Sequence, residues 1–184
     1  MAFFHLITHA GFKALLFLCA GFYMFTSRGA QDIRLISVYG GPAAIVLINV
    51  SNLALCGIPF MSGFYSKDRI VDYLFVMGVN PLVVLTILFS CALTVSYSLR
   101  LVASVNSGGR HLWGVMGDGD FLMLFTMGGL GVYSVVGGAC LSWLVIEAPC
   151  TMGGPEKLAI FFMVVLGGFF RQGPGVLLYF TSSM

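Results

Sequence analysis

Charged residues are scarce in this sequence. Only 9% of its residues are Asp, Glu, Lys or Arg, against roughly 25% in soluble domains. So few charges cannot solvate the surface of a water-soluble fold, and the mean hydropathy is +0.99. The nine lysines and arginines are scattered and form no basic stripe, so the net charge of +2 indicates no nucleic-acid partner. The composition therefore predicts a protein that inserts into a membrane.

Two sequence signatures are also missing. No C-x-x-C pair occurs among the five cysteines, so no disulfide framework is indicated. Four of them lie in apolar runs and are interpreted as small buried hydrophobic residues: Cys19, Cys56, Cys91 and Cys140. The pair Gly129-x-Gly131 lacks the third glycine of a dinucleotide-binding fingerprint, so no nucleotide site is indicated.

The sequence contains several long apolar runs. A bilayer crossing needs about 20 apolar residues. Four continuous runs are long enough, at residues 2–25, 81–103, 121–146 and 158–180. Together with the interrupted run between the first two, they predict an all-α, polytopic transmembrane helix bundle of about five crossings, one of them a discontinuous helix.

The interrupted run lies between residues 43 and 79. Its first half, residues 43–58, is only marginally long enough for a bilayer, and Gly57, Pro59 and Gly63 follow. The run resumes at Ser66 with a charged cluster. Because the two halves together are too long for one straight helix, we predict a break there, with Ser66 as the N-cap of the second half.

The distribution of arginines favours this topology. With one broken crossing, the loops after residues 25 and 103 share a side that holds Arg28, Arg34 and Arg110, with Arg100 nearby. The opposite side has little beyond Lys157. By the positive-inside rule, the arginine-bearing loops are predicted to face the cytoplasm or the matrix.

The first predicted span carries three titratable residues on one helical face. His5, His9 and Lys13 follow one another at intervals of four residues, so each lies about 6 Å along the helix axis from the next. Ionisable groups at membrane depth usually mark ion or proton paths, and histidine exchanges protons near neutral pH. Alternatively, His5 and Lys13 extend to the membrane interfaces and His9 bonds a neighbouring helix. A metal site at the histidines is disfavoured, because no carboxylate or cysteine is near.

Lys67 and Asp68 form a second candidate site at the predicted break. The positive end of a helix dipole suits Asp68 but disfavours the charge of Lys67, which eases release of its proton. A lysine beside a carboxylate in a broken helix is a switchable proton site. The alternative is a charged surface loop in which these residues, Arg69 and Asp72 are solvated. Arg171, inside the last predicted span, is a weaker candidate.

The stretches that hold these candidates resemble a known family. MAFFHLITHAGFKALLFLCAG, then QDIR, then SNLALCGIPFMSGFYSKD resemble the chain 5 family of mitochondrial NADH–ubiquinone oxidoreductase, respiratory complex I. That family is one branch of the antiporter-like subunits, which the multisubunit Na⁺/H⁺ antiporters share. The resemblance is specific over residues 1–73 and looser through TVSYSLRLV. Beyond Asn106 it rests on hydropathy and spacing.

The resemblance implies a proton-pathway role for each candidate. His5 and His9 would belong to the family's central hydrophilic axis, and Lys13 would be the lysine along that axis. Lys67 would be the lysine of the second broken helix, near the proton exit, with Asp68 beside it. A lysine at this position also separates chain 5 from the chain 4 relative, where a glutamate is typical.

The sequence departs from the family in two ways. Gly11 replaces a bulky residue between the histidine and the lysine, and we expect looser packing there. The earlier half of the family, with its own broken helix and lysine, has no counterpart, nor does the lateral helix. Met1 aligns with an internal position, which implies a fragment or a split-gene product.

Together with the residues above, the resemblance implies the later part of a proton-translocating membrane-arm subunit of NADH:ubiquinone oxidoreductase, in the mitochondrial inner membrane. Residues 1–105 would form the antiporter-like proton-translocation segment and residues 106–184 the C-terminal spans. NADH, FMN, iron–sulfur clusters and ubiquinone are expected in partner subunits of the complex, among them neighbouring antiporter-like subunits. The alternatives are a subunit of a cation/proton antiporter without redox activity, and a structural scaffold.

Overall fold

Every regular element in the described part of the chain is a helix. The structure is a computed structural model that describes residues 1–27, 29, 31, 41–106, 121–145, 162 and 164–168. Its elements are α1 (Ala2–Thr26), α2 (Gly41–Cys56), α3 (Ser62–Val76), α4 (Pro81–Asn106), α5 (Phe121–Val132), the π-helical turn η1 (Tyr133–Gly137) and α6 (Gly138–Val145). The predicted all-α transmembrane class is confirmed.

Three stretches of described helix are long and apolar enough to cross a membrane, namely Ala2–Thr26, Pro81–Val105 and Phe121–Leu144. They correspond to the first, third and fourth predicted crossings. Of the fifth predicted crossing, the structure describes Phe162 and residues 164–168, which are helical apart from the gap between them. The predicted loop arginines and Arg171 lie outside the described residues.

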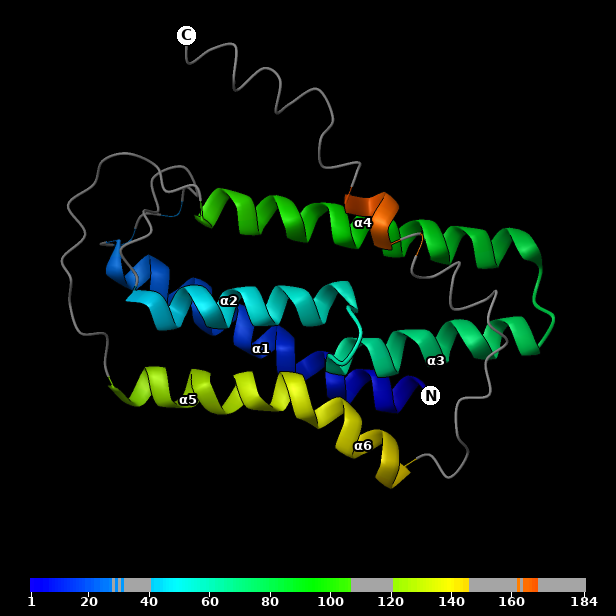
Figure 1. The fold of residues 1–184 in the computed structure, drawn as a ribbon, viewed down its shortest axis with the longest axis horizontal. Helices are drawn as coiled ribbons and strands as arrows, with labels where there is room; N and C mark the ends of the chain where they lie inside the picture. The colour runs from blue at the N-terminus through cyan, green and yellow to red at the C-terminus, as the bar shows by residue number, and fades with distance from the viewer. Residues whose placement is uncertain are drawn as a thin grey trace, which may run out of the picture.

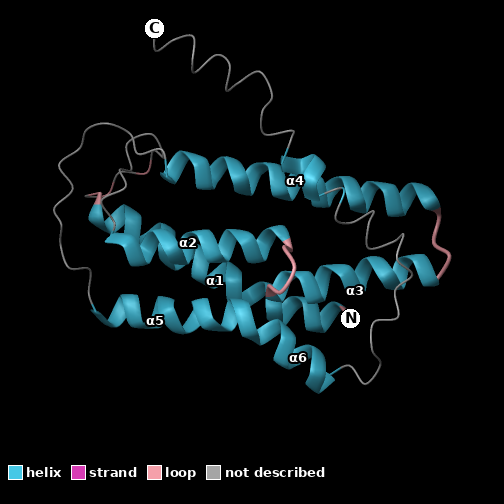
Figure 2. Cartoon of the chain, in the orientation of Figure 1, coloured by secondary structure: helices cyan, strands magenta, loops and turns pink. Residues whose placement is uncertain are grey.

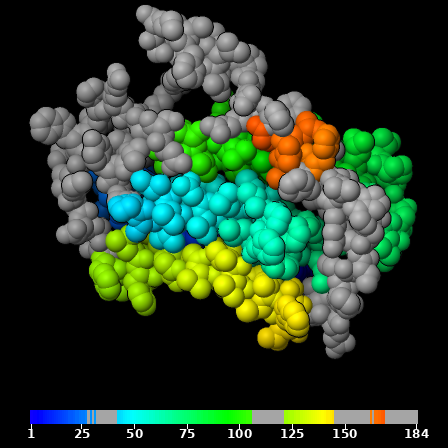
Figure 3. Space-filling model, viewed as in Figure 1, coloured from blue at the N-terminus to red at the C-terminus, as the bar shows by residue number. Residues whose placement is uncertain are grey.

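The helices run up and down the bundle. The end of α1, the start of α2, the end of α4 and the start of α5 lie together at one end, as the predicted topology requires (Figure 1). In the space-filling view α2 lies between α4 and α5 (Figure 3). α1 packs against α2, α3 and α5, whereas α4 packs against α2 and α3.

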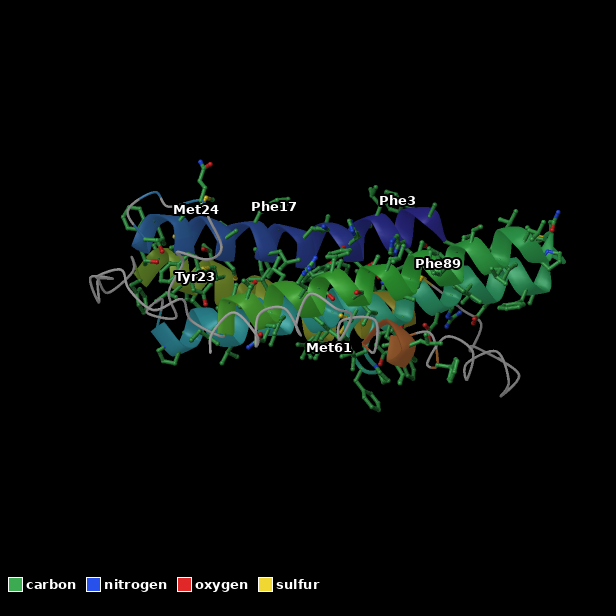
Figure 4. All side chains as sticks on the ribbon, turned by 90° about the horizontal axis from the view of Figure 1, so that it is seen from above. Phe3, Phe17, Tyr23, Met24, Met61 and Phe89 are labelled. Carbon is green, nitrogen blue, oxygen red and sulfur yellow. The ribbon has the colours of Figure 1, made fainter. Side chains whose placement is uncertain are left out.

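The core between these helices follows from the spacing of residues on α1. Its buried side chains recur every three or four residues and so form one face: Phe4, Thr8, Phe12, Leu15, Cys19 and Phe22. Tyr23 points into the bundle beside this face, whereas Phe3, Phe17 and Met24 point away from it (Figure 4). An apolar outer surface suits a membrane protein, because lipid tails are as apolar as these side chains.

The predicted break lies between α2 and α3. The two helices point in the same direction and are joined by a short loop (Figure 2). They have 16 and 15 residues, so each is only about 24 Å long or less, short of the roughly 30 Å of a bilayer core. The prediction of a discontinuous helix is therefore confirmed.

α2 ends in a glycine-based cap. Gly57 has a φ of +78°, in the left-handed region that favours glycine. Its N–H donates to the carbonyl of Ala54 at 3.2 Å, and the N–H of Ile58 donates to that of Leu53 at 3.3 Å. These two bonds make the Schellman pattern, which satisfies carbonyls that a helix end leaves open.

α3 begins earlier than the sequence predicted. Its N-cap is Met61, and Ser66 is a buried residue within the helix, so the predicted N-cap at Ser66 is wrong. The reason is a tertiary contact: Gly63 lies against the carbonyl of Ala54, so closely that a Cβ atom there would overlap it. The first turn of α3 is thus fixed on the last turn of α2, and this contact outweighs the capping preference of serine.

The fourth crossing carries a stripe of small residues, Ser134, Gly138 and Ser142, four positions apart. Ser134 and Ser142 are buried, and a Cβ atom at Gly138 would overlap the backbone of Ser62. The backbones of α6 and α3 therefore touch, as small residues allow in membrane bundles.

The cysteines follow the prediction only in part. Cys19 and Cys56 are buried as predicted. Cys91 is only partly buried and Cys140 is exposed, so burial was wrongly predicted for Cys140. The reason is that an apolar run in a membrane protein also supplies the side chains that face lipid, so hydropathy alone does not separate the two faces.

The Gly63 contact predicts a large effect of a small substitution. Gly63→Ala should destabilise the purified chain by about 2 kcal/mol or more, because the added Cβ separates α3 from α2. The measurement is thermal unfolding in detergent. Gly128→Ala is the matched control, since nothing lies within 4 Å of a Cβ there. Equal stability of the two variants would contradict the contact.

Candidate functional site

The two histidines of α1 lie at the junction of α1 with α3. The ring centroids of His5 and His9 are 5.5 Å apart, and His9 contacts Phe12 edge to face at 5.2 Å. His5 Nδ1 is hydrogen-bonded to Ser66 Oγ at 3.0 Å. The Ser66 hydroxyl donates its own proton to the carbonyl of Gly63 at 3.3 Å. The lone pairs of Ser66 Oγ are therefore left to accept a proton from His5 Nδ1. Ser66 is therefore the link from the histidines to the helix break.

Lys13 continues the same face of α1. It is partly buried and interacts electrostatically with His9. Within the described part of the chain it makes no hydrogen bond, so the structure places it beside the histidines without fixing its ammonium. The stripe predicted from the i, i+4 spacing is thus present, and its first member makes the contact to α3.

Lys67 is held at the break by two helices other than its own. Its Nζ donates to the carbonyl of Leu55 at 2.8 Å and to Thr94 Oγ1 at 3.2 Å. The Leu55 carbonyl belongs to the last turn of α2, where the helix dipole is negative and a cation is favoured. The sequence suggested instead that the positive end of α3 governs this lysine. Folding brings the ammonium to the opposite kind of helix end.

Gly57 also makes room for Lys67. A Cβ atom at Gly57 would lie 3.3 Å from Lys67 Cδ, closer than most real Cβ contacts. The glycine therefore supplies both the left-handed turn that ends α2 and the space through which the lysine stem reaches Leu55.

The remaining charged residues of this cluster are not solvated as a surface loop would be. Asp68 is 7% exposed and interacts electrostatically with Lys67. Arg69 and Asp72 are both partly buried and make interactions of their own. The alternative of a solvated charged loop is therefore wrong.

The structure brings the two predicted sites into one electrostatic cluster. His5 and His9 interact with each other and both interact with Lys67. These three basic groups come from α1 and α3, which are far apart in the sequence. Spacing along a single helix could not show that the histidines and Lys67 are neighbours.

α4 contributes a polar face that the sequence reasoning missed. Besides Thr94, Ser98 lies on it, with its hydroxyl 2.8 Å from Cys56 Sγ at the end of α2. Cys91 occupies the same face one turn earlier. The signal that could have revealed this face is the spacing of three small polar residues by three and four positions in a strongly apolar helix.

The packing around Gly11 differs from the expectation. The ring of Tyr133 occupies the space beside Gly11, so that a Cβ atom at Gly11 would overlap it. The Tyr133 hydroxyl donates to the carbonyl of Ile7 at 3.4 Å. The prediction of looser packing is wrong, because a side chain from η1 replaces the bulk that Gly11 lacks.

Metal binding has no further support in the described residues. Nowhere among them do three or more His, Cys, Asp or Glu side chains come together as a metal site would require.

The fold and the site define a class of protein. A polytopic helical bundle with ionisable side chains along one span and at a discontinuous helix is the arrangement typical of membrane proteins that move ions or protons.

Comparison with known proteins identifies the family. Residues 1–94 match the family described as NADH:quinone oxidoreductase/Mrp antiporter, TM, and the chain belongs to this family. Residues 97–172 match a second family, NADH dehydrogenase subunit 5 C-terminus. The resemblance found in the sequence is confirmed and extends beyond Asn106.

Individual relatives agree with this assignment. The chain is 42% identical over 177 residues to NADH-ubiquinone oxidoreductase chain 5 of Anopheles gambiae, covering 91% of this chain and 30% of the relative. The same protein of Locusta migratoria is 40% identical over 176 residues, covering 92% and 31%, and that of Lumbricus terrestris is 38% identical over 178 residues, covering 91% and 30%. The chain therefore spans about 30% of the length of these relatives.

The Gly11–Tyr133 contact predicts a compensating pair. Gly11→Leu should destabilise the chain by about 1–3 kcal/mol, because the ring of Tyr133 fills the space. In a Tyr133→Ala background the same change should cost much less, giving a coupling energy of about 1 kcal/mol or more between two residues in contact. Thermal unfolding of the four chains in detergent measures it. Strict additivity would show that the two residues do not touch.

Proposed function

We propose that this chain is the later part of a proton-translocating membrane subunit of NADH:ubiquinone oxidoreductase in the mitochondrial inner membrane. The observation that carries the proposal is the position of Lys67. Its ammonium lies at the break of a membrane helix, bound to Leu55 and Thr94, in the electrostatic field of two histidines. A titratable group held by exchangeable hydrogen bonds inside a membrane can take up and release a proton.

The histidines give this lysine a source of protons. His9, His5 and Ser66 form a continuous line from the α1 face to α3, with ring contact and then a hydrogen bond. Ser66 is the residue next to Lys67. A proton on His5 is thus within one hydrogen bond of the turn of α3 that carries the lysine, and Lys13 extends the line along α1.

Electrostatic repulsion between these groups favours passing a proton on to the next group over holding it. His5, His9 and Lys67 are all cationic when protonated, and they interact in surroundings of low dielectric constant. Charging one of them therefore disfavours the charge on the next. Asp68, buried beside Lys67, supplies a negative charge that favours the charged form of the lysine.

Electron transfer belongs to other subunits in this proposal. NADH, FMN, iron–sulfur clusters and ubiquinone would bind in partner subunits of the complex, with neighbouring antiporter-like membrane subunits in direct contact. Residues 1–105 would form the proton-translocation segment and residues 106–184 the spans that follow it. The chain would then take part in the enzyme as its proton translocase and would hold no redox centre.

Replacing Lys67 tests the proposal. In the full-length subunit assembled in its complex, Lys67→Met and Lys67→Arg should both lower the number of protons pumped per electron, because neither side chain releases a proton near neutral pH. The measurement is proton uptake by membrane vesicles during NADH oxidation. Arg100→Met, which removes an exposed cation from α4, is the control and should leave the ratio unchanged.

The outcomes separate the alternatives. An unchanged number of protons pumped per electron in both Lys67 variants would contradict the role of Lys67 as a proton carrier. Cation-driven proton exchange without any NADH-oxidising activity in the purified complex would favour the antiporter. Substitutions of His5 and Lys67 that alter assembly but never transport would favour the structural scaffold.

A further inference from the structure

Among the described residues, Thr94 supplies the side-chain oxygen that accepts a hydrogen bond from the Lys67 ammonium, and the backbone carbonyl of Leu55 is the other acceptor. The Thr94 hydroxyl donates to the carbonyl of Cys91 at 2.7 Å, which uses its single proton. Its lone pairs are then left to accept from Lys67 at 3.2 Å. The internal bond of α4 thus fixes the hydroxyl as an acceptor.

The hydrogen bond between Thr94 and Lys67 is not what holds α4 in its place in the bundle. Ser98, one turn further along α4, makes its own bond to Cys56 at the end of α2. Val95, Ala92 and Leu88 supply the buried apolar contacts of the same helix. The position of α4 at the break therefore does not depend on the Thr94 hydroxyl, and replacing threonine with valine keeps the shape of the side chain.

We infer that Thr94 is a positioning residue for proton release: its hydroxyl holds the charged form of Lys67 at the break and sets the pH at which the lysine gives up its proton. The inference rests on the proposed role of Lys67 as a proton carrier. A hydrogen bond to a charged group is stronger than one to a neutral group, so losing the acceptor weakens the charged lysine more than the neutral amine.

The test is the pH profile of pumping in the full-length subunit assembled in its complex. Thr94→Val should move the alkaline limb of the proton-to-electron ratio to lower pH by about one unit, a tenfold change in the proton affinity of the site. Thr94→Ser, which restores a hydroxyl, should return the profile to that of the unmodified protein. A change that only disturbed packing would alter the amount of assembled complex and leave the profile where it was.

Thr86→Val is the matched control. Thr86 lies on the same helix and makes the same kind of bond, to the carbonyl of Val83 at 2.8 Å, but its side chain is exposed. Its profile should not move. A shift equal to that of Thr94→Val would overturn the inference, because the effect would then come from any hydroxyl lost on α4.

Two further outcomes distinguish failure of the inference from failure of the proposed function. A normal profile in Thr94→Val, together with reduced pumping in Lys67→Met, would refute the role of Thr94 alone. Normal pumping in Lys67→Met would refute the proposed role of Lys67 as a proton carrier, on which the inference rests. If Thr94→Val does not assemble, Thr94→Cys supplies a weaker acceptor in the same place; a smaller shift in the same direction is expected, and none would refute the role.

Discussion

A membrane helix can be interrupted only where the backbone groups freed by the break find partners within the protein, because the hydrocarbon offers none. This constraint is met at the end of α2 by three donors. The N–H groups of Gly57 and Ile58 satisfy two carbonyls in the Schellman pattern, and the Lys67 ammonium satisfies that of Leu55. The lysine is therefore part of what makes the break stable as well as the group proposed to titrate in it. A structural need and a proposed chemical role coincide in one side chain.

Close backbone packing surrounds this break and fixes the distances within the site. Gly63 brings α3 onto α2, and Gly138 brings α6 onto α3. On α1, Gly11 admits the ring of Tyr133 from η1. π-helical turns are often found at functional sites, and here the turn places an aromatic ring against the helix that carries the histidines. The residues that hold the site together are thus mostly ones without side chains, since the bilayer supplies no hydrophobic force between helices.

The site gathers more positive than negative groups. His5, His9 and Lys67 interact with one another, and Asp68 is the buried carboxylate among the described residues. In surroundings of low dielectric constant, protonation of one of these groups disfavours protonation of the next. The arrangement suits a path in which protonation of one group prepares the release of another, as the proposed function requires.

The sequence by itself determined the features that depend on local pattern. Hydropathy located the first, third and fourth crossings, glycine and proline located the break, and the i, i+4 spacing placed His5, His9 and Lys13 on one face. The family resemblance added Lys67 and Asp68 to the same predicted pathway. The structural inferences succeeded because bilayer thickness and helical periodicity act on neighbouring residues along the chain.

Only the tertiary structure decided which residues from distant segments meet. It moved the start of α3 away from Ser66, filled the space beside Gly11 with Tyr133, and brought Lys67 to the end of α2 and to Thr94. No local rule contains these contacts, because each depends on how closely two helices approach. In a membrane that distance is set by the small residues and polar groups on both helices together.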